Sequence, residues 1–515
     1  MRAALREAAT ERVALVEFPT PTLGWNTNEN ITAVPQGFAL TMDNFIAQPN
    51  KVVVRKGQVN HVTGFNSSET VESLLVYQPT GTNAKLFAAT SSGVYNATLS
   101  GVVGAAEFAA TNGRWQQVNF ANSAGTYLLI VNGTDNLRYY DGSTWTSVAT
   151  YGTINTNTLI GVAVYQQRLF FIEKNARRVL YLPAGAITGT ANATAFNVEQ
   201  IFPRGGYVQA IGTWTVDSGA GTDDRFVVIT SEGEVAVFIG TDPSSVSTWS
   251  LIGVYYIGRP IGRRCLQKLG GDLLVLTDRG LFPLSRAIQS STVEPTVALT
   301  RNIEQTIISQ AASLFSQFGW DLTISTVDQL LILNVPSTPT VQYVMQLQTG
   351  GWSRFTGHAA SCFAFFDGKL FYGTQAKVVQ AMTGSTDFGS PFTAELIYAY
   401  SRLGAGRKKF VKMLQLIAEA AGSASVELGV ATDFAQTPSY RSLAISPTGN
   451  VGVWDNSSWD QFVWGSGEGE VSKRWATIPT RGAFYIAPAL KVTTATASFA
   501  VLAMAALVQQ GSILV

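Results

Sequence analysis

Charge is the scarcest property of this 515-residue chain, because Lys, Arg, Asp and Glu together make up only 13% of it. Soluble domains carry about 25% of such residues. The 35 basic and 34 acidic residues leave a net charge of +1, which excludes an overall basic nucleic-acid-binding protein. Hydrophobic residues reach 46%, and this excludes intrinsic disorder, which needs low hydrophobicity and high net charge.

Cysteine and histidine are also scarce, with two of each: Cys265, Cys362, His61 and His358. A disulfide scaffold would need more cysteines, so we interpret both thiols as buried. Cys362 follows His358 closely but lies in an apolar, strand-like stretch, where a thiol stays inert. Metal-site spacings and phosphate-binding loops do not occur. The sequence therefore predicts no catalytic residue, no metal, no cofactor and a chain that is not an enzyme.

Long apolar runs are missing as well. The N-terminus has no apolar core of the kind that a secretion signal needs. The most apolar stretch, residues 497–508, is shorter than the roughly 18 residues that would suggest a membrane-spanning helix. We interpret it as a buried strand pair or a short core segment and expect no stable membrane insertion. A membrane-inserting tail is the alternative.

A repeat of short hydrophobic runs dominates what the sequence does contain. Each run precedes a turn, often with glycine, and then a second strand-like run. The steps between successive runs are 42, 42, 57, 47, 57 and 40 residues, measured at one marker in each. A period in the forties fits four short strands with turns, which is one blade of a β-propeller. The markers are Leu86, Leu128, Phe170, Val227, Leu274, Leu331 and Phe371.

The sequence thus predicts an all-β protein with a propeller-like repeat body. We expect six or seven blades over residues 69–390, an extended N-terminal segment over 1–68 that contributes to a platform, and a C-terminal β platform domain over 391–515. Apolar residues at helical spacing predict one inserted helix over about 300–318. This helix would pack on the repeat body or, alternatively, dock another subunit. Two unrelated β-sandwiches are the alternative to a propeller.

One basic cluster interrupts the low charge, around the glycines of residues 404–406. This setting predicts an exposed loop that enters a strand. Three interpretations of this loop stay open: a solvated loop, a contact to DNA phosphates, or a contact to an acidic neighbouring subunit. The cluster consists of Arg402, Arg407, Lys408, Lys409 and Lys412.

A second local pattern, Asp141-Gly142-Ser143-Thr144-Trp145, is similar to part of the Asp-box turn of sialidase propellers. It is one residue short and occurs once. We interpret it as an Asp-Gly turn followed by a core tryptophan. A propeller glycosidase is the rival hypothesis that this pattern keeps open, although carboxylate pairs cannot be found by spacing.

Three further motifs carry a family resemblance, and they are spread from the N-terminal segment to the C-terminal domain. The first opens with Gly24-Trp25-Asn26-Thr27, the second lies in residues 348–357, and the third in residues 454–460. Together they resemble tail nozzle proteins of short-tailed bacteriophages, also called tail tube or packaged-DNA stabilisation proteins. The apolar C-terminus departs from the polar, glycine-ended strand pair of that family. The motif residues are Asp43, Asn44, Phe45, Arg55, Gly57, Trp352, Arg354, Phe355 and Trp459.

The resemblance implies a structural virion protein of the phage tail, assembled in the host cytoplasm. It implies a homo-oligomeric ring, usually a hexamer, with the portal or adaptor ring and tail fibres or spikes as neighbours. The lumen would retain packaged double-stranded DNA without sequence specificity and conduct it during ejection. Low charge suits a conduit, since each neutralised phosphate adds affinity. A propeller-type receptor- or glycan-binding tail component is the alternative.

Overall fold

The computed structural model describes residues 13–79, 81, 83–187, 193–217, 222–245, 247–289, 295–403, 407–421, 424–435, 437–445, 470–478, 480–494 and 498–511. The chain forms two compact units. The propeller unit comprises Val59–Tyr343 and Gly357–Met382. The platform unit comprises Met1–Gln58, Val344–Thr356 and Thr383–Val515. The platform unit is therefore built from three stretches of chain, where the sequence suggested contributions from the two ends.

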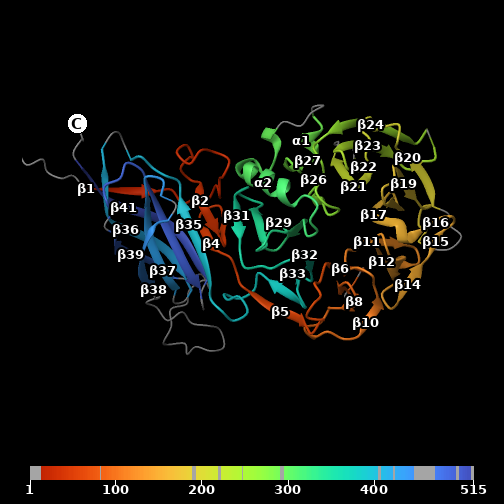
Figure 1. Ribbon diagram of the computed structural model, residues 1–515, viewed down its shortest axis with the longest axis horizontal. Coiled ribbons are helices and arrows are strands. Elements are labelled where there is room, and N and C mark those ends of the chain that lie inside the picture. The colour runs from red at the N-terminus through yellow and green to blue at the C-terminus, as the bar shows by residue number, and fades with distance from the viewer. Residues whose placement is uncertain are drawn as a thin grey trace, which may run out of the picture. The chain divides into compact units, whose positions relative to one another are not determined.

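Blades one to four of the propeller unit are four-stranded antiparallel meanders (Figure 1). Their strands are β6 (Ser73–Tyr77), β7 (Lys85–Ala89), β8 (Gly93–Asn96) and β10 (Ala106–Ala109); β11 (Gln116–Asn122), β12 (Gly125–Val131), β13 (Leu137–Tyr140) and β14 (Trp145–Val148); β17 (Leu159–Tyr165), β18 (Arg168–Glu173), β19 (Arg178–Tyr181) and β20 (Thr194–Asn197); β21 (Val208–Asp217), β22 (Thr222–Thr230), β23 (Glu234–Gly240) and β24 (Trp249–Tyr256). A short ribbon, β15 (Thr150–Tyr151) and β16 (Ile154–Asn155), and a 3₁₀ turn, η1 (Thr156–Thr158), connect blades two and three.

Blades five to seven depart from this plan. Blade five has three strands, and blade six begins with a hairpin. Blade seven is completed by β5 from the N-terminal side of the chain, which lies next to β34 and pairs in parallel with β9. The strands are β25 (Leu266–Leu269), β26 (Asp272–Thr277) and β27 (Gly280–Pro283); β28 (Asp321–Ser325) and β29 (Leu330–Val335), with β30 (Val341–Gln346) next in the chain; β32 (Cys362–Phe366), β33 (Lys369–Thr374), β34 (Lys377–Ala381), β5 (Gln58–Thr63) and β9 (Gly101–Val102).

The blades close into a ring through their innermost strands. β6, β11, β17, β21, β25, β28 and β32 each contact the next, and β32 contacts β6. The seven repeat markers all lie on the second strands of the blades, and none is more than 2% exposed. A second strand has a strand on each side and a blade against each face, so it has to be hydrophobic throughout. The predicted all-β, propeller-like fold is confirmed.

Aromatic rings fill the space between blades, which explains their abundance in the sequence. Between blades three and four, Phe170 and Phe226 have ring centroids 4.4 Å apart. Trp249 lies 5.5 Å from Phe238 in the same cluster. Offset and edge-on ring pairs of this kind add about 0.5–1.5 kcal/mol each beyond the area they bury.

A helical insertion connects blades five and six. It contains α1 (Leu284–Ala287), η2 (Pro295–Val297), η3 (Arg301–Ile303) and α2 (Glu304–Leu314). Ile307 and Ala311 of α2 are buried, and the helix contacts β27. Ile308 is 37% exposed. The predicted inserted helix is confirmed, and it packs on the propeller.

The platform unit consists of two mainly antiparallel sheets. The long strand β41 contains most of the apolar stretch 497–508, for which the sequence predicts a buried strand pair or a short core segment. This part of the stretch forms one mostly buried strand, so of these two expectations the strand pair is not observed. β36 pairs with one edge of β41, and β1 and β4 share its other edge, which explains why β41 is apolar. The strands are β1 (Val13–Phe18), β3 (Phe45–Ala47), β4 (Val52–Val54), β36 (Lys409–Ala420), β39 (Glu470–Thr477) and β41 (Phe499–Gln510) in the first sheet; β31 (Trp352–Phe355), β2 (Ala39–Asp43), β35 (Phe392–Tyr398), β40 (Ile486–Thr494), β37 (Ala424–Thr432) and β38 (Ser439–Ile445) in the second.

Helices of the described part of the chain are all too short or too polar to cross a membrane.

Candidate functional sites

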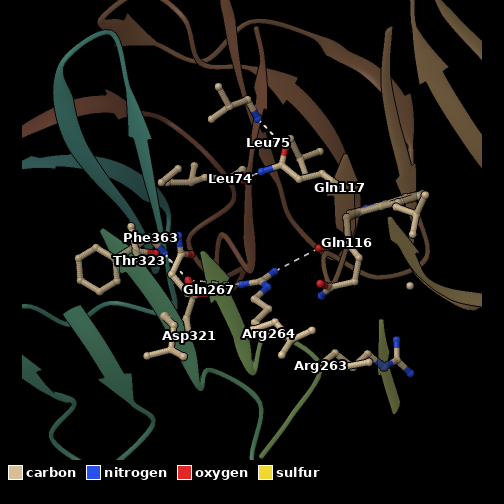
Figure 2. A pocket seen from close by; sticks show the side chains of 18 of the residues that line it. Leu74, Leu75, Gln116, Gln117, Arg263, Arg264, Gln267, Asp321, Thr323 and Phe363 are labelled. Carbon is tan, nitrogen blue, oxygen red and sulfur yellow. Dashed lines mark hydrogen bonds and ion pairs between the residues drawn. The ribbon is translucent and has the colours of Figure 1, made fainter. Parts of the chain in front are cut away.

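The inner strands of the propeller surround an axial channel. Its inner chamber has a volume of about 450 Å³ and is lined by residues of all seven inner strands (Figure 2). An outer chamber of about 460 Å³ lies where the inner strands begin. Its wall is formed by loops between blades, by the loops that connect the second and third strands of blades two and three, and by the end of the helical insertion. The two chambers share five lining residues: Gln116, Ile160, Gln209, Arg263 and Arg264.

Amide side chains form hydrogen bonds with backbone N–H and C=O groups at the open edges of the inner strands. Gln117 of β11 accepts a hydrogen bond from the backbone N–H of Val76 at 2.7 Å. Asn119 donates to the carbonyl of Val76 at 2.9 Å and accepts from the N–H of Gln78 at 3.0 Å. An unpaired buried backbone group is costly, so these neutral side chains replace the strand that an edge lacks. Part of the low charge of the sequence is therefore explained by these neutral strand edges.

Arg264 connects three blades across the inner chamber. Its Nη2 donates to the Glu72 carbonyl at 3.0 Å and to Ser73 Oγ at 2.6 Å. Its Nη1 lies 4.0 Å from Asp321 Oδ2. Burial raises the pKa of Asp321, and the Arg264 charge opposes this rise. Figure 2 shows Arg264 between Asp321 and Gln116, which fits a bracing role for this side chain.

In the platform unit, the structure brings together motif residues from distant parts of the chain. Arg354 of β31 donates from Nε and Nη2 to the two carboxylate oxygens of Asp43 at 2.7 and 2.6 Å. Phe45 and Trp352 are fully buried, and Phe355 is nearly so. The fork-shaped pair fixes β31 beside β2, since two parallel charge-assisted bonds add geometric specificity.

Arg55 is the centre of this cluster, and its side chain is 0% exposed. Its Nη1 and Nη2 donate to the two carboxylate oxygens of Asp387 at 3.0 and 2.7 Å. Its Nε donates to Asn44 Oδ1 at 2.9 Å. The guanidinium lies 4.0 Å from the ring centroid of Phe392. A buried arginine is tolerated here because its charge is paired and its donors are bonded.

A left-handed backbone conformation at one motif position and a close backbone contact at another explain the residues found there. Asn44 has a φ of +58°, a left-handed conformation in which Asn is enriched, and its Oδ1 also accepts from the N–H of Thr356 at 2.9 Å. A Cβ on Gly57 would lie 2.0 Å from the carbonyl oxygen of Thr386. Only glycine fits there. Trp459, the last predicted motif residue, lies outside the described residues.

The basic cluster is divided by burial. Arg402, Arg407 and Lys412 are exposed, Lys408 is half-buried and Lys409 is buried. Lys409 Nζ donates to the carbonyl of Phe484 at 3.3 Å. Burial and then the nearby Arg402 lower the pKa of Lys409. Lys409 thus presents no charge to a partner in this structure, and the predicted contact surface is reduced to its exposed members.

Other predicted positions have structural roles. Cys265 and Cys362 are free and buried, and burial raises their thiol pKa values to about 12 and about 11. Asp141 Oδ1 accepts from the backbone N–H groups of Ser143 and Thr144 at 2.8 and 2.7 Å. The structure thus has the Asp-Gly turn, and Trp145 packs in the core that blades one and two share. No group of three His, Cys, Asp or Glu side chains that could hold a metal occurs among the described residues.

Sequence reasoning missed the channel residues Arg263 and Arg264. A signal was present, because two adjacent arginines follow Gly262 in a chain with few charges. It also missed Asp387, the partner of Arg55, which lies 332 residues further along the chain.

Comparisons with known proteins give a distant likeness in structure. No family model and no curated protein matches the sequence. BBS1N in complex with ARL6DN is 11% identical, with 64% of this chain and 97% of that chain covered and a TM-score of 0.38. YCF48 bound to D1 peptide is 11% identical, with coverage of 68% and 99% and a TM-score of 0.33. Neither is a tail nozzle protein, so that resemblance stays a prediction.

A third similar structure corrects one prediction. The exo-β-1,3-galactanase of Phanerochaete chrysosporium is 9% identical, with 76% of this chain and 95% of that chain covered and a TM-score of 0.26. It is a glycoside hydrolase, so the prediction that this chain is not an enzyme is withdrawn. A likeness this distant does not make the chain an enzyme either.

Proposed function

We propose that this chain is a subunit of a bacteriophage tail nozzle, a homo-oligomeric ring that retains packaged DNA and conducts it during ejection. One observation carries the proposal. Motif residues that define the family resemblance, Asp43, Asn44, Arg55 and Arg354, meet in one hydrogen-bonded cluster of the platform unit. Residues that bond one another across some 300 positions are a requirement of the fold, so their joint occurrence supports a shared architecture.

The first sheet of the platform unit offers a surface for a second copy. Paired residues of adjacent strands share a face, and on its outer face Leu15 pairs with Leu507, and Gln415 with Trp475. Leu15 is 55%, Val471 57% and Trp475 36% exposed. The exposed charged residues Glu17 and Lys473 share this face, since they pair with Ala505 and Ile417. Exposed apolar residues with polar residues at their rim are typical of interaction sites.

The same face contains a groove and an unsatisfied amide. The groove has a volume of about 430 Å³ and includes Gln415, Ile417 and Ala505. Gln415 is 5% exposed, and its Nε2 has no partner among the described residues. An unsatisfied buried donor costs about 1–3 kcal/mol, and an acceptor from a neighbouring subunit would remove that cost. We name residues Leu15, Met413, Gln415, Ile417, Val471, Trp475, Ala505 and Leu507 the platform face.

Negative-stain microscopy and mass photometry of the purified full chain test the proposal. We expect closed rings, and we expect Trp475→Ser to weaken self-association by about 2 kcal/mol or more, the usual cost of a hot-spot tryptophan. Leu99→Ser is the matched control, because Leu99 is 84% exposed and belongs to the propeller unit, so it is not part of the platform face. A monomer at every protein concentration would refute the ring.

The exposed cations test the DNA part of the proposal separately. The triple substitution of Arg402, Arg407 and Lys412 by Gln should leave ring formation intact and weaken salt-dependent retention of double-stranded DNA. If the triple variant fails to form rings while Leu99→Ser forms them, the cluster belongs to a subunit interface.

A further inference from the structure

The outer chamber of the propeller channel is strongly cationic. Its described lining residues include Arg114, Lys174, Arg263 and Arg264 and no Asp or Glu. Its volume of about 460 Å³ lies within the range of small-molecule sites, about 300–1,000 Å³. The chain has a net charge of +1, so this excess of positive charge is local and does not show in the overall composition.

Two of these charges are already used by the fold. Arg264 braces the inner chamber as described above. Arg114 Nε lies 3.1 Å from Glu72 Oε1, and its guanidinium lies 4.6 Å from the ring centroid of Phe318. We therefore do not assign Arg114 or Arg264 as a primary ligand for a molecule bound in the chamber.

The other two charges have no acidic partner within the described structure. Arg263 Nη1 makes one long hydrogen bond, 3.4 Å, to the carbonyl of Asn132. Arg263 is exposed to solvent at the chamber. Partial desolvation by the surrounding protein still lowers its pKa, and nearby Arg114 lowers it further against the opposing effect of Tyr207. Lys174 is exposed at the chamber. An anion bound between these side chains would offset both the desolvation and the repulsion.

Neutral amides surround the same space. Gln116, Asn175 and Gln317 line the chamber, and within the described part of the chain their side chains take part in no hydrogen bond. Each offers a donor and an acceptor, which is the pairing that a hydroxyl group needs. The amides of Gln117 and Asn119, by contrast, are used by the neighbouring strand β6. The lining therefore combines cationic groups for an oxyanion with amides for hydroxyls.

We propose that the outer chamber binds a sugar that carries an oxyanion, either a uronate or a sugar phosphate. Arg263 and Lys174 bind the oxyanion, and Gln116, Asn175 and Gln317 bind the hydroxyl groups. The site is independent of ring formation by the platform unit. Carboxylate and phosphate present the same chemistry to the two cations, so the choice between them is left to the probes.

Isothermal titration calorimetry of the full chain with three probes tests the site: glucuronate, glucose 1-phosphate and glucose. We expect saturable binding of at least one acidic probe, and its identity distinguishes the two sources. Glucose at the same concentration should give no saturable heat. Binding of the acidic probe should weaken as salt is added, because charge–charge attraction is screened.

Two variants and a control locate the site. Arg263→Gln should weaken binding about tenfold, equal to about 1.4 kcal/mol, because it removes a hydrogen bond to a charged group. Lys174→Gln should weaken binding of the acidic probe about threefold, as for other exposed charge pairs. Because Lys174 is exposed, this variant decides the question if Arg263→Gln fails to fold by circular dichroism. Arg279→Gln is the matched control, because Arg279 is exposed on the turn between β26 and β27 and lines neither chamber.

Three results would overturn the proposal. The first is the absence of saturable binding of both acidic probes. The second is equal binding of glucose, which would remove the role of the cations. The third is an affinity of Arg263→Gln and Lys174→Gln equal to that of Arg279→Gln, which would place binding elsewhere on the molecule.

Discussion

Replacing Arg55 by leucine should destabilise the platform unit more than an ordinary core substitution does. The change removes all the hydrogen bonds of a fully buried guanidinium, among them the pair to Asp387 and the bond to Asn44. It leaves the Asp387 carboxylate, 15% exposed, without its counter-ion. Breaking a buried pair from one side costs about 3–5 kcal/mol, whereas a typical single substitution costs about 1 kcal/mol.

The loss can be measured by urea unfolding followed by far-ultraviolet circular dichroism. Hydrogen exchange with mass spectrometry then shows where it acts. Protection should fall in β2, β31 and β35 of the platform unit, while the second strands of the propeller blades keep theirs. Equal loss in both units would mean that Arg55 supports more than its own cluster.

A double-mutant cycle separates the ion pair from the other contacts of Arg55. Asp387→Leu alone should also destabilise, because it leaves the arginine charge buried. The double variant Arg55→Leu with Asp387→Leu should cost well below the sum of the single costs, since no unpaired charge remains. Additive costs, or a cost of Arg55→Leu below about 1 kcal/mol, would refute the reasoning.

Three smaller predictions follow from single positions. Gly57→Ala should lower the melting temperature in differential scanning calorimetry, because its Cβ would lie 2.0 Å from the Thr386 carbonyl oxygen; an unchanged melting temperature would contradict the contact. Burial raises the thiol pKa values of Cys265 and Cys362 to about 12 and about 11. Both thiols should therefore resist iodoacetamide at pH 8 in the native protein and react fully in urea. Stoichiometric labelling of the native protein would contradict this prediction, because it would show that a thiol is accessible. Burial of Asp141 opposes its ionisation, but hydrogen bonds from Thr144 and Ser143 outweigh this and lower its pKa from 3.8 to about 2. A group whose pKa is lowered by folding stabilises the fold at pH values above its ordinary pKa. The stability advantage of wild type over Asp141→Ala, measured by urea unfolding, should therefore shrink as the pH falls from 3.8 towards 2. An advantage independent of pH would contradict this prediction.

The sequence was sufficient to find the blades, because burial acts most strongly on one strand of each. Markers such as Phe170 and Leu331 lie on second strands, which have neighbours on all sides. The closing strand β5 has no such signal, since an outer strand is partly exposed and lies far in sequence from β34. Periodicity therefore reveals the repeat and not the way in which the ring closes.

For the candidate sites, the sequence identified some of the residues but not their partners or their burial. Arg55 and Arg354 were selected from a motif, yet their partners depend on pairings across the whole chain, as with Asp387. In the basic cluster, adjacent positions alternate in burial: β36 begins at Lys409, which is buried, while Lys412 is exposed. Composition locates a charge, and strand geometry decides whether a partner can reach it.

The division of the platform unit into three stretches has a consequence for synthesis on the ribosome. Among the described strands, β41 at the centre of the first sheet is the last to be made, and β1, which pairs with it, is the first. The blades can therefore fold before β41 is made, whereas the first platform sheet must wait for β41, since domains generally fold as units. A prematurely terminated product would lack this sheet and with it the platform face. The order of elements along the chain thus makes the platform face depend on β41, because only molecules that include this strand carry the surface on which copies would meet.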